Sequence, residues 1–422
     1  MLELSRIREE KDAIAEGLKT RNLDVKNQLE EVIALDEKRR DTQQQMEKDL
    51  AELNTLAKSI GGLFQQGKVE EANVLKAKTG TLKEQSSQLK TVLQETEDAI
   101  NKILFTIPNV PNPIVPKGNS DQDNEIIFEN GQLPQLHAKA LPHWDLIKQY
   151  DLVDFELGVK ITGAGFPVYK GKGARLQRAL INFFLDEAIN AGYEEVIPPL
   201  LVNADSGFGT GQLPDKDGQM YHDAQDNLYL IPTAEVPITN IYRDVILNES
   251  QFPIKNVGYT PCFRREAGSW GSDVRGLNRL HQFDKVEIVQ VVHPDKSYDT
   301  LDQMVAHVKN LLEKLELPYR VAKLCGGDLG FTSALTFDME VFSAAQEKWL
   351  EVSSISNFET FQANRLKLRY KSEGNKPQLA HTLNGSALAL PRILASILEN
   401  NQTETGINVP KVLVPYTGFD TI

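Results

Sequence analysis

Four arginines are concentrated in one stretch of the chain, residues 259–289, between two runs that have the composition of β-strands. They are Arg264, Arg265, Arg275 and Arg279. A planar guanidinium group donates two parallel hydrogen bonds, so arginines around a glycine-containing turn suit an oligophosphate or a carboxylate ligand. The alternative is a solvated surface hairpin. Acidic residues in the same stretch give alternating charge, which indicates a binding site or an ion-pair network: Glu266, Asp273 and Glu287.

The motifs of the commonest nucleotide-binding folds do not occur in this sequence. There is no Walker loop and no G-x-G-x-x-G after a predicted strand. The glycine-rich stretch 207–211 runs into Pro214, and we interpret it as a loop rather than a phosphate cradle. The seven histidines show no paired-ligand spacing, and Cys262 and Cys325 lie far apart. This pattern argues against a disulfide framework and a cysteine-based zinc site, and it fits a reducing cytoplasm.

The first hundred residues are expected to be helical, because no proline precedes Pro108 and Glu, Lys, Gln, Leu and Ala predominate. Heptad-like seams lie on both sides of the glycine-containing stretch 60–71. They are Met46, Leu50, Leu53, Ala57, Ile60, Phe64 and then Leu75, Leu82, Leu89. We predict an antiparallel hairpin over about 27–104, an arm roughly 50 Å long. Periodicity alone leaves a coiled-coil dimerisation element equally open.

Composition divides the rest of the chain. A proline-rich stretch at 107–125 predicts a linker between an N-terminal helical arm domain, 1–106, and a second domain, 126–422. In the second domain, strand-like runs such as DKVEIVQVV and KWLEVSSIS alternate with single helical runs. This pattern predicts an α+β fold with a mainly antiparallel β-sheet flanked by helices. No run of about 18 apolar residues and no secretory signal is visible, so we expect a cytoplasmic protein without a membrane span.

Several motifs together resemble those of class II aminoacyl-tRNA synthetases. FRREAG followed by RGLNRLHQFDKVE, within the arginine-rich stretch, is similar to the second signature motif of that class. HTLNGSALALPRILASILEN at 381–400 resembles the third, which is marked by an arginine that opens a helix, here Arg392. A helix at 174–191 and a strand ending in Pro198-Pro199 resemble the first. IPTAEVPITN, EVSSISNFETFQANR and the N-terminal hairpin resemble the seryl branch, the bacterial-type seryl-tRNA synthetases.

The resemblance implies a ligase that activates L-serine with ATP and Mg²⁺ and transfers it to the 3′ end of tRNA(Ser), with tRNA(Sec) as a second candidate. It implies catalytic roles for Arg264, Arg392 and Glu351, adenine stacking on Phe283, and magnesium ligation by Glu351 and Ser354. The implied ATP-binding residues are Arg264, Arg265, Glu266, Arg275, Leu280, Phe283, Glu351, Val352, Ser353, Ser354 and Arg392. The implied serine-binding residues are Thr233, Ala234, Glu235, Glu287 and Ser386, with Glu287 as the partner of the hydroxyl.

The resemblance also implies a homodimer, and we expect the apolar face of helix 174–191 to contribute to it. That face is Leu176, Leu180, Phe183, Phe184 and Ala188.

The net charge of −13 argues against a nucleic-acid partner. The distal part of the arm, residues 58–90, is nevertheless net positive, so we expect its end to contact tRNA through Lys68, Lys76 and Lys78. Two rivals are an enzyme that loads a carrier protein and a coiled-coil scaffold without activity.

Overall fold

The computed structural model describes residues 1–215, 217–266 and 275–422, and its contacts divide the chain into two compact units. The helical unit comprises Leu2–Lys19 and Leu23–Pro108. The α+β unit comprises Met1, Thr20–Asn22 and Asn109–Ile422. No helix among the described residues is long and apolar enough to cross a membrane.

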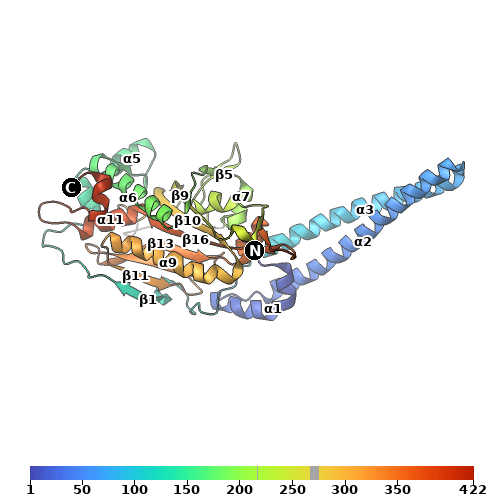
Figure 1. The fold of residues 1–422 in the computed structure, drawn as a ribbon, viewed down its shortest axis with the longest axis horizontal. Coiled ribbons are helices and arrows are strands. Elements are labelled where there is room, and N and C mark those ends of the chain that lie inside the picture. Colours follow the sequence, from blue (N-terminus) through green and yellow to red (C-terminus); the bar gives the residue numbers. More distant parts are fainter. Residues whose placement is uncertain (216, 267–274) are drawn as a thin grey trace. The chain divides into compact units, whose positions relative to one another are not determined.

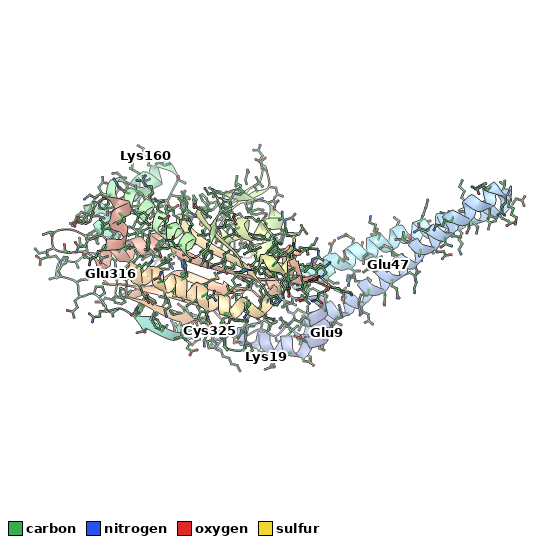
Figure 2. The ribbon with its side chains drawn as sticks, in the orientation of Figure 1. Glu9, Lys19, Glu47, Lys160, Glu316 and Cys325 are labelled. Carbon is green, nitrogen blue, oxygen red and sulfur yellow. The ribbon has the colours of Figure 1, made fainter. Side chains whose placement is uncertain are left out.

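The helical unit contains the predicted antiparallel hairpin. Its helices are α1 (Leu4–Leu18), α2 (Lys26–Gln65) and α3 (Val69–Leu104). Helices α2 and α3 lie side by side along their length (Figure 1). The turn between them is only three residues long, with Gly67 in the left-handed region at φ +76°. Side chains project outward from the hairpin on several sides, Glu47 among them (Figure 2), which is typical of a solvated two-helix arm.

A buried carboxylate ties the base of this unit together. Asp36 on α2 is fully buried, and it pairs with Arg8 of α1 and with Arg39 at 2.8 Å. Arg40 lies 3.5 Å from the same carboxylate. Removing one partner of a buried ion pair is strongly destabilising, so Asp36 belongs to the packing of the unit's base.

The α+β unit is built on an eight-stranded sheet with the strand order β1-β11-β12-β13-β16-β10-β9-β4. Every pairing in it is antiparallel except that of β4 with β9. The bounds in that order are Glu125–Asn130, Tyr319–Lys323, Leu335–Ser343, Lys348–Asn357, His381–Ala389, Gln282–Val292, Ile254–Phe263 and Glu194–Glu195. The fold class predicted from the sequence is confirmed.

Three of the helices that pack against this sheet contribute side chains to the main core (Figure 1). They are α6 (Gly171–Asn190), which contacts β9 and β10, α9 (Ser297–Lys314), which contacts β13 and β16, and α11 (Leu390–Asn400), which contacts β10, β12 and β13. Apolar side chains from these helices and one face of the sheet form the main hydrophobic core, which includes Val286, Ile288 and Ile355. The opposite face of β10 is therefore free to carry polar side chains, because successive strand residues point to opposite faces.

One expectation about the dimer is wrong at the level of residues. The apolar face of α6, including Leu176, Leu180 and Phe184, is at most 1 % exposed and packs in the core of its own unit. An amphipathic helix beside a sheet buries its apolar stripe against that sheet, and this stripe has nothing left for a second subunit. The segment after it differs, because Ile197 is 87 % exposed and Leu200 and Leu201 are also exposed.

Shorter elements surround the sheet. The helices are α4 (His143–Gln149), α5 (Phe155–Ile161), α7 (Ala204–Thr210), α8 (Glu235–Asn240), α10 (Thr360–Leu366) and α12 (Val414–Thr417). The small sheets are β2-β3 (Val153–Asp154, Val168–Tyr169), β5-β7-β6 (Leu201–Val202, Leu228–Leu230, His222–Asp223) and β15-β14-β8 (Gln378–Leu379, Arg369–Lys371, Ile246–Asn248). The glycine-rich stretch 207–211, interpreted above as a loop, instead completes α7, and Gly211 caps it at φ +97°. Glycine at that position is favoured because a left-handed residue often ends a helix.

Candidate active site

Strand β10 places three side chains of different chemistry on one face. Phe283, Lys285 and Glu287 alternate along the strand, and the intervening Val286 and the following Ile288 point into the core. On the neighbouring strand, Cys262 and Thr260 lie opposite Phe283 and Lys285. The face thus runs from an aromatic ring through a cation to a carboxylate, three groups that a ligand with a ring, anionic groups and a polar end could contact in that order.

Arg264 follows β9 and lies over the ring of Phe283, with its guanidinium carbon 5.2 Å from the ring centroid. Its Nε also donates to the carbonyl of Pro232 at 3.3 Å. Arginine over an aromatic ring leaves most of its N–H groups free for an anion. The structure thus brings together Arg264 and Phe283, two residues that the sequence assigned to one ligand.

Glu287 lies at the buried end of this face and is fully buried. Its carboxylate is 2.7 Å from Lys285 Nζ and accepts from Asn384 Nδ2 at 2.8 Å. Ser386, directly opposite on β16, donates from Oγ at 3.4 Å. Each of these donors offsets part of the hydration that the carboxylate loses on burial.

A second carboxylate, Glu235, stands near Glu287. It begins α8, is 7 % exposed, and accepts from Gln362 Nε2 at 2.6 Å, while its own N–H donates to Thr233 Oγ1 at 3.3 Å. Burial, together with the nearby charge of Glu287, raises the pKa of Glu235 to about 7, although the Gln362 hydrogen bond and the two cations Lys285 and Arg264 act in the opposite direction. Two buried carboxylates close to a single lysine favour the binding of an ammonium group.

Ala234, the residue before Glu235, contributes an apolar side chain rather than a polar group. It is fully buried and packs against Ile238 and Val289. The predicted serine-binding residues thus converge from the stretch 233–235, β10 and β16.

A β-bulge explains how Glu351 and Ser354 come to share a face. In a regular strand, residues three apart point to opposite faces. Here Met339 pairs with Ser353 and Glu340 with Glu351, so Val352 is an extra residue and shifts the alternation by one. Val352 accordingly packs in the core with Ile355. Glu351 and Ser354 are left on the other face.

Asp338, directly opposite Ser354 on β12, adds a third oxygen donor nearby. Its Oδ1 is buried without a partner in the part of the chain that the structure describes. Burial and the charge of Glu351 raise the pKa of Asp338 well above its usual value, and the hydrogen bond with Ser354 opposes this. Among the described residues, no three His, Cys, Asp or Glu side chains are arranged as a complete metal cage. The oxygen set suits Mg²⁺, which takes one or two carboxylates and completes its shell with phosphates and water.

Arg392 opens α11 and faces this oxygen cluster. Its Nε donates to the carbonyl of Asn278 at 3.0 Å, and its Nη1 donates to the carbonyl of Glu351 at 2.5 Å. Nη1 also lies 3.7 Å from the Glu351 carboxylate. Pro391 stands in the first turn of this helix, where a missing N–H is tolerated, so the arginine is placed at a fixed point of the helix start.

The remaining residues of the arginine-rich stretch are held by aromatic rings and ion pairs. Arg275 lies 4.5 Å from the ring centroid of Trp144, and Arg265 lies 5.8 Å from that of Tyr221. Glu266 pairs with Arg279 at 2.8 Å. Asp273 lies in the segment 267–274, outside the described residues.

Three predicted ATP-binding residues direct their side chains away from a ligand. Leu280 and Val352 are in the hydrophobic core, and Ser353 Oγ donates to the carbonyl of Ser386 at 2.5 Å. Only their backbone groups are left to contact a ligand.

The arm residues lie in the helical unit, where Lys68 is 3.6 Å from Glu71 and Lys78 is 2.5 Å from Glu52. Lys76 is exposed on α3.

Sequence reasoning missed four side chains of this site: Lys285, Gln362, Asn384 and Asp338. Lys285 could have been found, because it lies between Phe283 and Glu287 at the two-residue period of a strand. The others come from distant parts of the chain: Asn384 and Asp338 are revealed by the order of the strands, and Gln362 by the packing of α10.

Two protein families match the chain. The family described as the seryl-tRNA synthetase N-terminal domain matches residues 1–111, and the one described as the tRNA synthetase class II core domain (G, H, P, S and T) matches residues 219–401. The serine–tRNA ligase of Salinibacter ruber is 49 % identical, over 100 % of this chain and 99 % of that protein. The serine–tRNA ligase of Exiguobacterium sibiricum is 45 % identical, over 99 % and 98 %.

The fold also matches solved structures. The crystal structure of seryl-tRNA synthetase from Pyrococcus horikoshii complexed with ATP superposes with a TM-score of 0.90 and 33 % sequence identity, covering 100 % of this chain and 99 % of that one.

Proposed function

Because this chain belongs to the seryl-tRNA synthetase family, we propose that it activates L-serine with ATP and transfers the serine to the 3′ end of tRNA(Ser) in the cytoplasm. The observation that carries the proposal is the single face of β10, on which Phe283, Lys285 and Glu287 succeed one another. ATP and serine together present their groups in the same sequence: adenine, then the reacting phosphate and carboxylate, then the serine side chain.

The first step joins the serine carboxylate to the α-phosphorus of ATP. The carboxylate oxygen attacks in line, the bond from the α-phosphorus to the bridging oxygen breaks, and pyrophosphate leaves with that oxygen and its electron pair. The nucleophile is already ionised, so the step needs positioning and charge stabilisation rather than a general base. In the second step a ribose hydroxyl of the tRNA 3′ end attacks the mixed anhydride and AMP leaves.

ATP is assigned to the Phe283 end of the face. Adenine stacks on Phe283, and Arg264, whose guanidinium lies over that ring, reaches the α-phosphate. Arg392 at the start of α11 contacts the γ-phosphate, and Arg275 is a further phosphate ligand. Guanidinium forks suit these anions because they bind two oxygens at once.

Mg²⁺ is assigned to Glu351 and Ser354, which the bulge at Val352 places on one face. When bound, the ion supplies charge that offsets the phosphates. The residues themselves orient the phosphate end of the pocket, and Glu351 also fixes Arg392 through its carbonyl.

Serine is assigned to the Glu287 end. Glu235 and Thr233 take the ammonium group, and Glu287 with Ser386 takes the hydroxyl. Glu287, Glu235, Thr233 and Ser386 are all buried, so a substrate that lacks the hydroxyl forgoes a hydrogen bond in a site where water does not readily replace it.

The helical arm is assigned to tRNA. Its end carries Lys68, Lys76 and Lys78, and a surface of exposed lysines contacts phosphates without reading sequence. Two of the three lysines have acidic neighbours at their own surface, Glu71 and Glu52, which a phosphate contact must displace. tRNA(Sec) is a second candidate for the same arm.

A homodimer is proposed on a different surface from the face of α6. Exposed apolar side chains at Ile197, Leu200 and Leu201 follow directly on α6 and β4 and flank Pro198-Pro199. Apolar side chains gathered in this way on a surface are typical of an interface.

The proposed reaction is tested by ATP–pyrophosphate exchange with each of the twenty amino acids, followed by charging of tRNA(Ser) and tRNA(Sec) transcripts. Serine is expected to support exchange best, with a requirement for Mg²⁺. Arg264→Ala is expected to remove exchange. A different amino acid as the best substrate would contradict the seryl assignment.

A further inference from the structure

A buried histidine–glutamate pair lies behind the proposed ATP site. His143 on α4 and Glu399 on α11 are both fully buried, and His143 Nδ1 lies 2.7 Å from Glu399 Oε1. The same carboxylate accepts from the backbone N–H of His143 at 2.9 Å, from Ser343 Oγ and from Gln346 Nε2 at 3.1 Å. Burial alone would raise the pKa of Glu399, but the hydrogen bonds from His143 and Ser343 outweigh it and lower that pKa, so the group is a carboxylate.

The contacts of His143 determine which ring nitrogen carries the proton. The nearest partner of Nδ1 is the Glu399 carboxylate at 2.7 Å, which only accepts, whereas Gln346 Nε2 is farther away at 3.4 Å, so Nδ1 is the donor. Nε2 faces the backbone N–H of Leu277 at 2.9 Å, which only donates, so Nε2 is the acceptor. The neutral imidazole satisfies both partners, and it links a carboxylate on α11 to a backbone N–H in the arginine-rich stretch.

The next residue, Asn278, is held from the other side. Its carbonyl accepts from Arg392 Nε at 3.0 Å, and its side chain donates to Gln346 Oε1 at 2.9 Å. Arg392 and Glu399 are seven residues apart on α11, which is about two turns, so they share one face of that helix. Three hydrogen bonds and two backbone segments therefore form a closed circuit. The hydrogen bonds join Glu399 to His143, His143 to Leu277, and Asn278 to Arg392; the backbone joins Leu277 to Asn278, and α11 joins Arg392 to Glu399.

The backbone before Leu277 fits closely against the same histidine. Gly276 has φ +64°, and a Cβ there would lie 2.4 Å from His143 Nε2 and 3.1 Å from Trp144 Cβ. Trp144 in turn lies against the Arg275 guanidinium. Four consecutive residues, 275–278, are thus seated on the start of α4 and the face of α11.

We propose that His143, held by Glu399, is a positioning residue for ATP: it holds Leu277 and Asn278 so that Arg392 and Arg275 are presented to the phosphates. His143 itself touches no substrate. The inference rests on the assignment of Arg392 and Arg275 to ATP made above. It predicts that loss of the contact with Leu277 raises KM for ATP and leaves KM for serine unchanged. The residues assigned to serine, Glu287 and Glu235, are not part of the circuit.

Two substitutions separate the two contacts of the imidazole. His143→Gln places an amide oxygen where Nε2 was and keeps an acceptor for the Leu277 N–H. His143→Asn places an amide nitrogen where Nδ1 was, keeps a donor for Glu399, and leaves the Leu277 N–H without an acceptor. His143→Asn is expected to raise KM for ATP in pyrophosphate exchange on the order of tenfold, the effect of removing one hydrogen bond, while KM for serine is unchanged. His143→Gln is expected to restore KM for ATP.

Hydrogen–deuterium exchange of the full-length protein gives a readout independent of activity. A peptide containing Leu277 is expected to take up deuterium faster in His143→Asn, and at the wild-type rate in His143→Gln. His307→Asn is the matched control, because His307 is a partly buried histidine that lies on α9 beside Tyr193, outside the circuit. It is expected to leave both KM values unchanged.

The outcomes separate this inference from the proposed function. If both His143 variants raise KM for ATP and for serine together, in step with a loss of Tm, His143 is only a packing residue and the inference is wrong. The same holds if His143→Asn leaves KM for ATP unchanged while Arg392→Ala raises it. If Arg392→Ala leaves KM for ATP unchanged, the ATP assignment is wrong instead, and the exchange result at Leu277 still decides whether His143 holds the backbone.

Discussion

Replacement of Glu235 by glutamine tests the electrostatics of the proposed serine pocket. Glu235 is buried, lies close to the charge of Glu287, and has its pKa raised to about 7 by these two causes. Glutamine has nearly the same shape and can still accept from Gln362 Nε2, but it carries no charge at any pH. The variant therefore removes the titration and leaves the packing in place.

The sign and size of the effect follow from the pKa. The folded state binds the proton of Glu235 more tightly than the unfolded chain does, since the pKa rises from 4.5 to about 7. This contribution to stability is fully present below pH 4.5, and it is lost as the pH rises through about 7. Each tenfold change in proton affinity corresponds to about 1.4 kcal/mol. The ionised carboxylate thus costs the folded state about 3 kcal/mol above pH 7, and Glu235→Gln does not bear this cost.

Urea unfolding measures the difference between the two proteins at a series of pH values from about 4.5 to 8, which spans the titration of Glu235. Tryptophan fluorescence reports on the α+β unit, because Trp144, Trp270 and Trp349 all follow the linker in the sequence. Relative to wild type, Glu235→Gln is expected to gain stability steadily as the pH rises to about 7. Glu373→Gln, at an exposed position between β14 and β15, is the control and is expected to show no such trend. A wild-type-to-variant difference that stays constant with pH would refute the reasoning.

Three further predictions concern selectivity, the arm and assembly. Glu287→Ala is combined with Lys285→Met so that no unpaired cation is buried. The double variant is expected to reduce the preference for serine over alanine, which reaches about 10⁴ in sites that bind a substrate hydroxyl. An unchanged serine-to-alanine ratio in pyrophosphate exchange would remove Glu287 from this role. Deletion of residues 43–90, closed by a short turn, is expected to leave exchange intact and abolish tRNA charging, whereas loss of both would make the arm a folding element. Replacing Lys68, Lys76 and Lys78 by alanine is expected to flatten the slope of log K against log salt for tRNA binding by about 0.7–0.9 for each phosphate that the arm no longer binds. Light scattering at micromolar concentration is expected to give a dimer that Ile197→Asp weakens, and a wild-type monomer would reject the interface.

The deletion boundaries illustrate what the structure adds to the sequence in the helical unit. Heptad spacing predicted the hairpin at about 27–104, and α2 and α3 agree closely with it. The glycines at 61 and 62 do not end α2, which continues to Gln65, because glycine weakens an exposed helix without breaking it. The buried ion pairs of Asp36 could not be predicted, since Arg8 reaches it from another helix. A deletion that began at residue 36 would therefore disturb packing as well as the proposed tRNA contact.

The site divides in the same way between local and distant information. The alternation of Phe283 and Glu287 on one strand is readable from the sequence, and so is the arginine that opens the helix after Pro391. The convergence of Glu351 and Ser354 is not, because their spacing of three predicts opposite faces and only the extra residue Val352 reverses this. The core position of Leu176 and its neighbours was misjudged because an apolar stripe has the same pattern at an interface and in a core.

The two ends of the β10 face impose opposite electrostatic conditions, and this explains how one pocket can treat its two substrates differently. At the proposed serine end, Glu287 and Glu235 are both buried and Lys285 pairs with Glu287, so a second negative charge on Glu235 is disfavoured in the absence of a cation. A small ammonium group relieves that charge, and a substrate without one does not. At the proposed ATP end, Arg264 and Arg275 are partly or fully exposed and lie over the rings of Phe283 and Trp144. Under the proposed assignments, selectivity for serine would come from desolvated groups, whereas binding of ATP would come from more exposed cations.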